Sequence, residues 1–315
     1  MLIQIVIFVI GLVILAKFSD LLIDAAVSLG KHLNLSNIFI GLTIIAFGTS
    51  LPEFLVSFVA LTKGSGGISI GNIIGSNIAN VALIIGVVGL LFPLRFKHKS
   101  EAKGLRKKEI LMSIFYMLLI LITLDGNLSR IDGLILVGLF FFFLYYSYKQ
   151  GVSDRSDDLE KKYGLPMSVG LTILSLAGLI VGANMMTTAA VNLATILGVN
   201  DYIIGATIVA LGTSLPELAA SYAAVKRGEL GMSLANIVGS NIFNILMVLG
   251  FISVFFTIPV DINIVLVDYG VMMFTALILA VCVFRKNKTI PRWVVYLSLI
   301  VYIGYVGRLL ALAFV

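Results

Sequence analysis

Long apolar stretches, separated by polar residues, recur from one end of the chain to the other. A bilayer requires about 20 apolar residues for each helical crossing. The pattern therefore predicts ten membrane-spanning helices, near residues 2–29, 36–62, 68–92, 108–124, 131–148, 167–197, 201–225, 231–256, 263–284 and 291–312. No basic residue precedes the first stretch and no small-residue cleavage site follows it, so it is interpreted as a span rather than a signal peptide.

The composition agrees with an all-α polytopic membrane protein. Of the 315 residues, 60% are hydrophobic and 12% are charged, whereas about a quarter of the residues in a soluble protein are charged. A dissolved enzyme, a nucleic-acid-binding protein and a secreted module are therefore excluded. The single cysteine excludes a disulfide scaffold. We expect the lipid bilayer as a partner, with no cofactor, no nucleic acid and no obligate protein partner.

The basic residues predict the orientation. Eighteen of the 22 lysines and arginines fall in the loops after odd-numbered spans, and three fall on the opposite side. Because basic loops stay in the cytoplasm, both termini are expected outside the cytoplasm, in a multi-pass protein of the cell membrane. The formal net charge of +6 is less informative than this placement.

An internal repeat is the most informative feature of the sequence. Residues 41–86 (GLTIIAFGTSLPEFLVSFVALTKGSGGISIGNIIGSNIANVALIIG) match residues 205–250 (GATIVALGTSLPELAASYAAVKRGELGMSLANIVGSNIFNILMVLG) at a constant offset without a gap. Resemblance between apolar helices cannot explain the match, because its identities include GTSLPE and GSN-x-x-N. Five spans separate the copies, and five is odd, so the copies must cross the membrane in opposite directions.

The predicted domains follow from this inverted repeat. Residues 1–150 form a first five-helix repeat, 151–166 form a cytoplasmic linker, and 167–315 form the second, inverted five-helix repeat. In inverted-repeat transporters the substrate site lies near the bilayer midplane, where broken helices from both halves meet. The arrangement therefore favours alternating access.

The repeated motifs contain the candidate chemistry. Proline interrupts a helix, so Pro52 and Pro216 should break their spans and free carbonyls near Ala46–Gly48 and Ala210–Gly212. Such carbonyls must line protein or a hydrated cavity. The two motifs also contribute two carboxylates (Glu53 and Glu217), several hydroxyls and several amide oxygens. These are all hard oxygen donors, which Ca²⁺ prefers, whereas zinc, copper and iron are poor candidates without histidine or cysteine.

The glutamates have two interpretations, a protonated or hydrogen-bonded structural residue and a cation ligand. A carboxylate at that depth costs about 2.5–3.5 kcal/mol, and its duplication in the same polar setting favours the cation ligand. The asparagines and serines could instead form interhelical hydrogen bonds, above all Asn72, Asn77 and their copies. Two ionised glutamates would give the site a charge of −2, which one Ca²⁺ or several monovalent ions would neutralise. Ions that compete for one set of donors are coupled, which is the minimum requirement for exchange.

These paired motifs in an inverted ten-span layout resemble the sodium/calcium exchangers of the Ca²⁺/cation antiporter superfamily, most of all the compact prokaryotic members. The resemblance implies a secondary antiporter, not an enzyme, that exchanges three Na⁺ for one Ca²⁺ and is therefore electrogenic. It implies Glu53 and Glu217 as central ligands of both ions. It also implies further ligands from hydroxyls, amides and backbone carbonyls: Thr49, Thr213, Ser50, Ser214, Ser76, Ser240, Asn80, Asn244, Ala46 and Ala210.

The resemblance leaves alternatives open. Members that require potassium carry aspartate at the position of Asn244, and proton/calcium exchangers usually carry a different first motif, so both H⁺-coupled and K⁺-dependent antiport are less favoured. A cation channel could use the same glutamates. An intramembrane enzyme is excluded because the spans contain neither HExxH nor a histidine partner for the Gly-Thr-Ser segment.

Acidic residues outside the motifs have ordinary explanations. Asp20 and Asp24, one turn apart on the first span, could line a cation access path, but a local ion pair near the interface is the preferred interpretation. Asp125, Asp132 and Asp268 lie near the expected ends of spans, so we expect them to be solvated.

Overall fold

The computed structural model describes residues 1–32, 46–96, 99–151, 162–226, 228–285 and 287–313. Within these ranges, eight helices are long and apolar enough to cross a membrane. The predicted span at 108–124 lies in α6 (Lys99–Ile122), whose first half carries the basic residues. The predicted span at 36–62 is described only from residue 46 onward, as α3 (Ala46–Thr49) and α4 (Leu51–Thr62).

The described parts of the two halves contain corresponding helices. The first half continues with α5 (Gly66–Leu91), α6 and α7 (Arg130–Gly151). The second half contains α10 (Ala210–Thr213), α11 (Leu215–Lys226), α12 (Leu230–Phe243), the π-helical segment η3 (Asn244–Leu249), α13 (Gly250–Phe255), α14 (Ile262–Phe284) and α15 (Arg292–Leu312). The bounds of α10 and α11 equal those of α3 and α4 shifted by the offset of the sequence repeat. The prediction of two five-helix repeats is confirmed.

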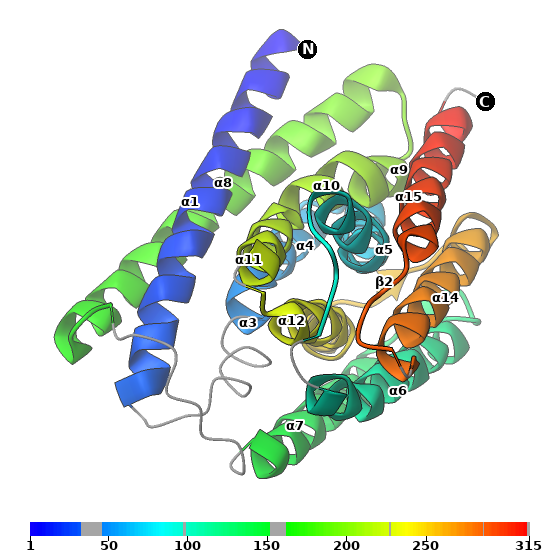
Figure 1. The fold of residues 1–315 in the computed structure, drawn as a ribbon. Helices are drawn as coiled ribbons and strands as arrows, with labels where there is room; N and C mark the ends of the chain where they lie inside the picture. Colours follow the sequence, from blue (N-terminus) through cyan, green and yellow to red (C-terminus); the bar gives the residue numbers. More distant parts are fainter. Residues whose placement is uncertain (33–45, 97–98, 152–161, 227, 286, 314–315) are drawn as a thin grey trace.

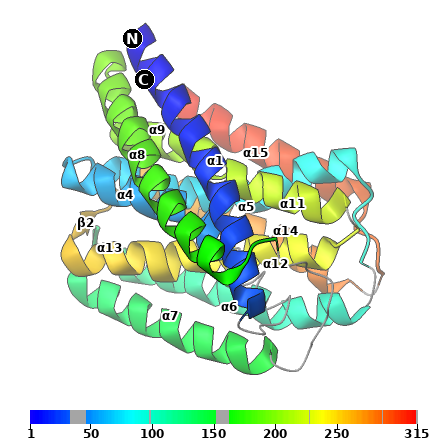
Figure 2. The same cartoon turned by 90° about the vertical axis from the view of Figure 1, so that its left-hand side faces the viewer.

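Two long helices lie together along one side of the bundle. They are α1 (Leu2–His32) and α8 (Leu165–Leu197), which cross the other helices obliquely (Figures 1 and 2). Their backbones approach closely at Gly11, where an added Cβ would lie 2.8 Å from the amide nitrogen of Met186. Glycine is therefore required at this crossing. Helices of this length can cross a bilayer at a tilt.

The centre of the bundle is formed by α5 and by the continuous rod of α12, η3 and α13. Both are buried along most of their length, with α6, α7, α14 and α15 outside them (Figure 1). The short α9 (Asp201–Ile204) and the π-helical η2 (Gly205–Val209) pack directly on α5. At Gly75 an added Cβ would lie 2.5 Å from the carbonyl oxygen of Ala206, so the glycine of the first GSN motif permits this close contact between the halves.

Short antiparallel pairings join loops at the two ends of the bundle. At one end β1 (Asn127–Leu128) pairs with β2 (Ile258–Pro259), and at the other Arg95 forms a single bridge with Thr289. Figure 2 shows these connections at opposite ends of the helices. The loops that pair at one end follow the fourth and eighth spans, and those at the other end follow the third and ninth. In a chain of ten spans, loops after even-numbered spans lie on one side of the membrane and loops after odd-numbered spans lie on the other, so both pairings agree with ten spans.

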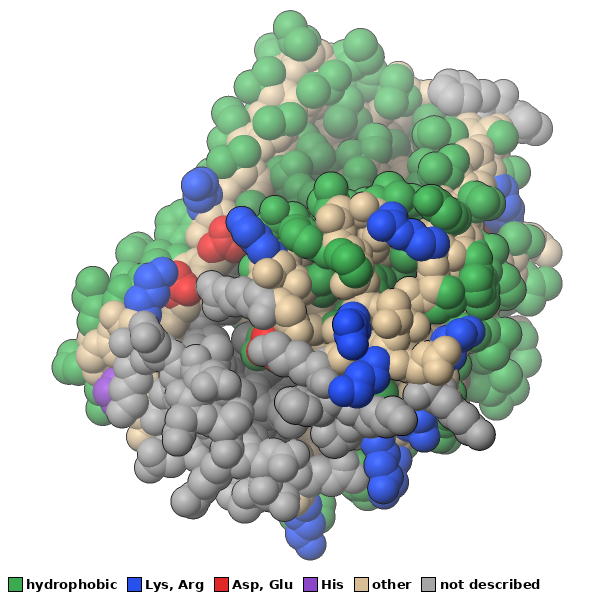
Figure 3. All heavy atoms as spheres, viewed as in Figure 1, with side chains coloured by type: hydrophobic (Ala, Val, Ile, Leu, Met, Phe, Trp, Pro, Cys, Tyr) green, Lys and Arg blue, Asp and Glu red, His purple; other side chains and the backbone are tan. Residues whose placement is uncertain are grey.

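Basic side chains gather at the end that carries Arg95. Figure 3 looks onto this end, where lysine and arginine side chains surround the helix ends and a hydrophobic rim covers the sides. Exposed members of this group are Arg95, Lys103, Lys107, Lys226 and Arg292. The outer surfaces of α1, α7, α8 and α15 are apolar and exposed, as required of helices that face lipid.

Candidate functional site

Each GTSLPE motif interrupts a helix at its serine. Ser50 has φ −84° and ψ 0°, and Ser214 has φ −81° and ψ 0°, so neither residue continues the preceding helix. The helix resumes with Leu51 and Leu215, and each proline occupies its second position. Proline is tolerated there because the first N–H groups of a helix have no intrahelical partner. The prediction that proline marks a break is confirmed, with the break placed two residues before it.

This placement puts each glutamate in the first turn of a new helix. Glu53 lies in the first turn of α4 and Glu217 in the first turn of α11. The N-terminal end of a helix favours negative charge. Both side chains are completely buried, and the hydroxyl of Ser50, three residues before Glu53, reaches the Glu217 carboxylate. The structure thus brings together the two carboxylates that the repeat predicts.

Hydroxyl groups from both halves approach each glutamate. The Ser50 hydroxyl donates to Glu217 Oε1 at 3.5 Å. The Thr49 and Ser240 hydroxyls also lie beside Glu217 and are 3.2 Å from each other. Around Glu53 the corresponding groups are Ser76 and Thr213, whose hydroxyls are 3.3 Å apart. Because the contacts cross between the halves, neither half can complete the site alone.

The backbone carbonyl of Ala210, which the sequence predicts to be freed by Pro216, is hydrogen-bonded. It accepts the backbone N–H of Ser214 at 3.1 Å and the hydroxyls of Ser76 and Thr213 at 3.4 Å each. It therefore faces the site but is not free. Pro216 lacks the N–H that would pair with Gly212, not the one that pairs with Ala210. Ala46 begins α3 at the equivalent position.

The second pair of motifs completes the site from α5 and from the junction of α12 with η3. Ser76 and Asn80 lie one turn apart on α5, with Ser240 on α12 and Asn244 at the start of η3. All four side chains are completely buried. A π-helical segment inside a helix is frequently associated with a functional site.

Several buried oxygen atoms in this region accept no hydrogen bond from the described residues. They are both carboxylate oxygens of Glu53, Oε2 of Glu217, Oγ of Ser214, and the amide oxygens of Asn80 and Asn244. Buried polar atoms are normally paired because leaving one unpaired costs about 1–3 kcal/mol. A group of unpaired oxygens around two carboxylates is therefore suited to a cation that would pair with all of them at once.

The donor set also limits which cations fit. In the part of the chain that the structure describes, no group of three or more histidine, cysteine, aspartate or glutamate residues comes together. The site combines two carboxylates with neutral hydroxyl, amide and carbonyl oxygens. Such a set suits Ca²⁺ and Na⁺ rather than zinc or copper. Ion binding by the twelve residues remains a prediction.

Asn72 and Asn236 support the site from behind. The amide of Asn72 donates to the Ser57 hydroxyl at 3.0 Å and to the Glu53 backbone carbonyl at 3.4 Å. Asn236 makes the equivalent contacts with Ser221 and the Glu217 carbonyl at 3.4 and 3.5 Å. The interhelical hydrogen bonds considered for these two asparagines are therefore present.

A buried acidic residue outside the motifs was predicted wrongly. Asp268 on α14 is completely buried, whereas its sequence position suggested solvation. It accepts hydrogen bonds from Arg308 and from the Tyr202 hydroxyl, each at 2.5 Å. Arg308, near the end of the last helix, supplies the partner that makes burial possible. The sequence did contain a signal for this pair. Arg308 lies within the last span, on the side of the membrane that carries few basic residues, and such a residue needs an acidic partner.

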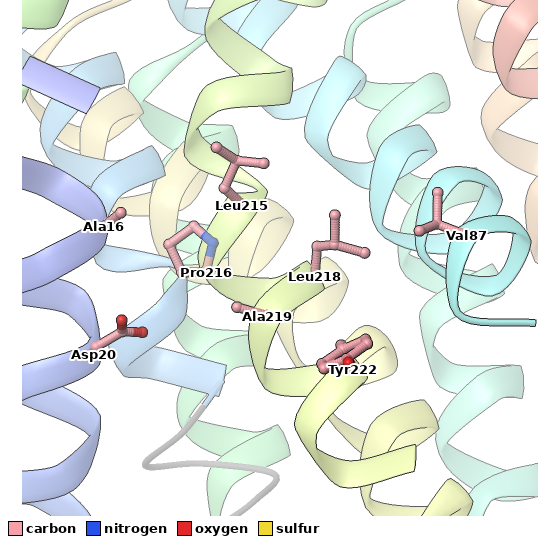
Figure 4. Close-up of a pocket in the computed structure, with 8 residues that line it drawn as sticks. All are labelled: Ala16, Asp20, Val87, Leu215, Pro216, Leu218, Ala219 and Tyr222. Atoms are coloured by element: carbon pink, nitrogen blue, oxygen red, sulfur yellow. The ribbon is translucent and has the colours of Figure 1, made fainter. Parts of the chain in front are cut away.

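A hollow of about 390 Å³ opens between α1 and α11, beside the second motif. Figure 4 shows Asp20 on α1 across this space from Pro216 and Ala219, with Tyr222 further along α11. Asp24 instead pairs with Lys162 at 2.5 Å. Asp24 therefore forms an ion pair, but with a distant residue of the linker rather than the local pair that was preferred from the sequence, and the Asp20 carboxylate faces the hollow.

Comparison with known proteins gives consistent matches over nearly the whole chain. The model of the family described as sodium/calcium exchanger protein matches residues 3–149 and 167–311. An uncharacterized membrane protein of Methanocaldococcus jannaschii is 37% identical over 96% of both chains. A sodium/calcium exchanger of Methanosarcina acetivorans is 30% identical over 95% of this chain and 96% of its own length. A solved structure of the sodium-calcium exchanger NCX_Mj, soaked with Na⁺ and Ca²⁺, has a TM-score of 0.70 at 35% identity and covers 97% of this chain and 98% of its own.

Proposed function

Because the chain belongs to the sodium/calcium exchanger protein family, we propose that it exchanges Na⁺ for Ca²⁺ across a membrane by alternating access. The single observation that carries the proposal is the group of unpaired, buried oxygens around Glu53 and Glu217. One Ca²⁺ would neutralise the two carboxylates. Na⁺ ions that use the same oxygens would exclude it, so that binding of one ion opposes the other.

The proposed ligands divide by type. The carboxylates of Glu53 and Glu217 bind both ions at the centre, together with the hydroxyls of Thr49 and Thr213 and the amide oxygens of Asn80 and Asn244. The remaining oxygens form outer Na⁺ positions, from the hydroxyls of Ser50, Ser214, Ser76 and Ser240 and the backbone carbonyls of Ala46 and Ala210. Four hydroxyl groups from opposite halves already lie in contact there, which supports sites shared between halves.

The proposed cycle exchanges three Na⁺ for one Ca²⁺ and moves one net positive charge. Residues 1–150 and 167–315 act as the two halves, joined by the linker at 151–166. The basic end of the bundle, with Arg95 and Lys107, faces the cytoplasm of the cell, and both termini lie outside. The excess of basic residues at one end supports this orientation.

Uptake of ⁴⁵Ca²⁺ into proteoliposomes tests the proposal. Vesicles loaded with Na⁺ and diluted into Na⁺-free buffer should accumulate ⁴⁵Ca²⁺, whereas vesicles with only a pH gradient or a K⁺ gradient should not. Clamping the membrane potential with valinomycin and K⁺ should change the rate if exchange is electrogenic. If a pH gradient drove uptake equally well, the coupling ion would be H⁺ rather than Na⁺. Ca²⁺ current without any counter-ion would indicate a channel.

A further inference from the structure

We propose that Asn241 is a positioning residue that turns the amide oxygen of Asn80 toward the ions, that Tyr116 fixes Asn241 in this task, and that the equivalent pair of Asn77 and Asn244 is adjustable. The inference rests on the proposed function, because it assigns a task to residues behind the same site. Neither Asn77 nor Asn241 was among the ligands predicted from the sequence. Both are completely buried, as is Tyr116.

The four asparagines form two hydrogen bonds that cross between the halves. The amide nitrogen of Asn80 donates to Oδ1 of Asn241 at 3.0 Å. The amide nitrogen of Asn244 donates to Oδ1 of Asn77, also at 3.0 Å. The two bonds are equivalent under the offset of the repeat. Each candidate ligand thus gives its N–H group to the other half and keeps its oxygen unpaired among the described residues.

The orientation of Asn241 is fixed by groups that accept from it. Its amide nitrogen donates to the backbone carbonyl of Asn77 at 3.2 Å and to the Tyr116 hydroxyl at 2.8 Å. A backbone carbonyl can only accept, so this end of Asn241 must be the nitrogen. Its oxygen then faces Asn80, which must donate to it. The oxygen of Asn80 is consequently the end left for an ion.

The equivalent pair, Asn77 and Asn244, is held by fewer hydrogen bonds. The amide nitrogen of Asn77 has no hydrogen-bond partner among the described residues. No described group holds this nitrogen as the Tyr116 hydroxyl holds that of Asn241. Nothing in the described part of this side opposes a joint reversal of Asn77 and Asn244. Asn80 is therefore the fixed amide ligand, and Asn244 is the adjustable one.

This difference has a chemical consequence for ions. A cation is attracted by an amide oxygen and repelled by an amide N–H group, so ligand strength depends on which end of the side chain faces the site. Residues that orient metal ligands typically change affinity by about 10- to 100-fold when they are replaced. Asn241 should hold Asn80 in the binding orientation throughout the cycle.

The test measures the half-saturating Ca²⁺ concentration for Na⁺-driven ⁴⁵Ca²⁺ uptake. Asn241→Ala should raise it about 10- to 100-fold, and Tyr116→Phe should raise it about three- to tenfold, the effect of one buried hydrogen bond. Tyr269→Phe is the matched control. It removes a buried hydroxyl that contacts Thr123 at 2.8 Å, away from the amides, and should leave the half-saturating concentration unchanged.

A double-mutant cycle separates positioning from general structural damage. If Asn241 acts through Asn80, Asn80→Ala combined with Asn241→Ala should have the same half-saturating concentration as Asn80→Ala alone. Multiplying effects, or a Tyr116→Phe protein that matches the wild type, would overturn the inference. If the wild type shows no Na⁺-driven uptake, the proposed exchange fails. The dissociation constant for ⁴⁵Ca²⁺, measured at equilibrium on the same purified variants, then replaces the half-saturating concentration in the double-mutant cycle. The positioning role is decided by the same comparison.

Discussion

The two halves of the molecule carry the same motif in different surroundings. In the first half α4 packs along α8, and Val56 and Ala60 join a buried cluster with Ala183 and Met186. In the second half the equivalent helix α11 makes only sparse contact with α1. The hollow that contains Asp20 lies between them (Figure 4). The repeat is thus symmetric in sequence motif and asymmetric in packing.

The sequence itself explains part of this asymmetry. Leu55, Val56 and Val59 of α4 correspond to alanines 219, 220 and 223 of α11. Smaller side chains leave volume that α1 does not fill, and Ala219 lines the hollow. The hollow lies in the half of the bundle nearest the basic end. Alternating access requires space beside the site that can open and close, and the hollow next to Pro216 is such a space.

The largest expected effect tests whether the glutamates of the two halves contribute equally to ion binding, although the packing around them differs. Glu53→Gln and Glu217→Gln should each reduce ⁴⁵Ca²⁺ uptake by at least about 100-fold, because replacement of mere supporting residues already costs about 10- to 100-fold. Glu109→Gln is the control, since this glutamate accepts a hydrogen bond from Ser113 on α6, away from the site. Near-normal uptake in either variant would remove that glutamate from the centre.

The next effect concerns the hollow. Ala219→Leu should fit while the hollow is open but obstruct its closure, where overpacking costs about 1–3 kcal/mol. Turnover should then fall by about 10- to 100-fold, with thermal unfolding unchanged. Ala223→Leu is the control, because Ala223 is exposed and does not line the hollow. Equal turnover in the two variants would mean that α1 and α11 do not close on each other.

The prolines are expected to have a smaller effect. Alanine at position 52 or 216 restores an N–H group and allows the helix to continue through the preceding serine. We expect uptake to fall about tenfold, a change of about 1.4 kcal/mol. The midpoint temperature of thermal unfolding in detergent should be unchanged or slightly higher. Pro216→Ala should have the larger effect because its ring also lines the hollow. Unchanged kinetics in both variants would show that the break does not depend on proline.

The smallest expected effect concerns Asp20, which has no acidic equivalent in the other half, where Asn184 occupies its position. A negative charge in the hollow should attract cations to it. Asp20→Asn should raise the half-saturating Ca²⁺ concentration on that side about two- to threefold at low salt and less at high salt. Asp24→Asn should not, because Asp24 is paired with Lys162. A salt-independent change would contradict the electrostatic role.

Features set by local pattern are those that the sequence predicts well. The spans, the inverted repeat and the proline-marked breaks follow from apolar length, parity and backbone chemistry. The pairing of Glu53 with Glu217 follows too, because duplicated polar residues inside a bilayer must meet protein rather than lipid. Asp268 shows where this reasoning stops. Its burial depends on Tyr202 and Arg308, which are distant in sequence and belong to other helices.

The amino-acid sequence by itself determined which groups reach the middle of the membrane and in which direction each half crosses it, since helix length and residue type act locally. Only the tertiary structure decided which amide ends point into the candidate site and which helices leave a hollow. Those outcomes depend on contacts such as that of Asn241 with Tyr116. They arise from shapes and hydrogen-bond partners brought together from many parts of the chain, which no local pattern records.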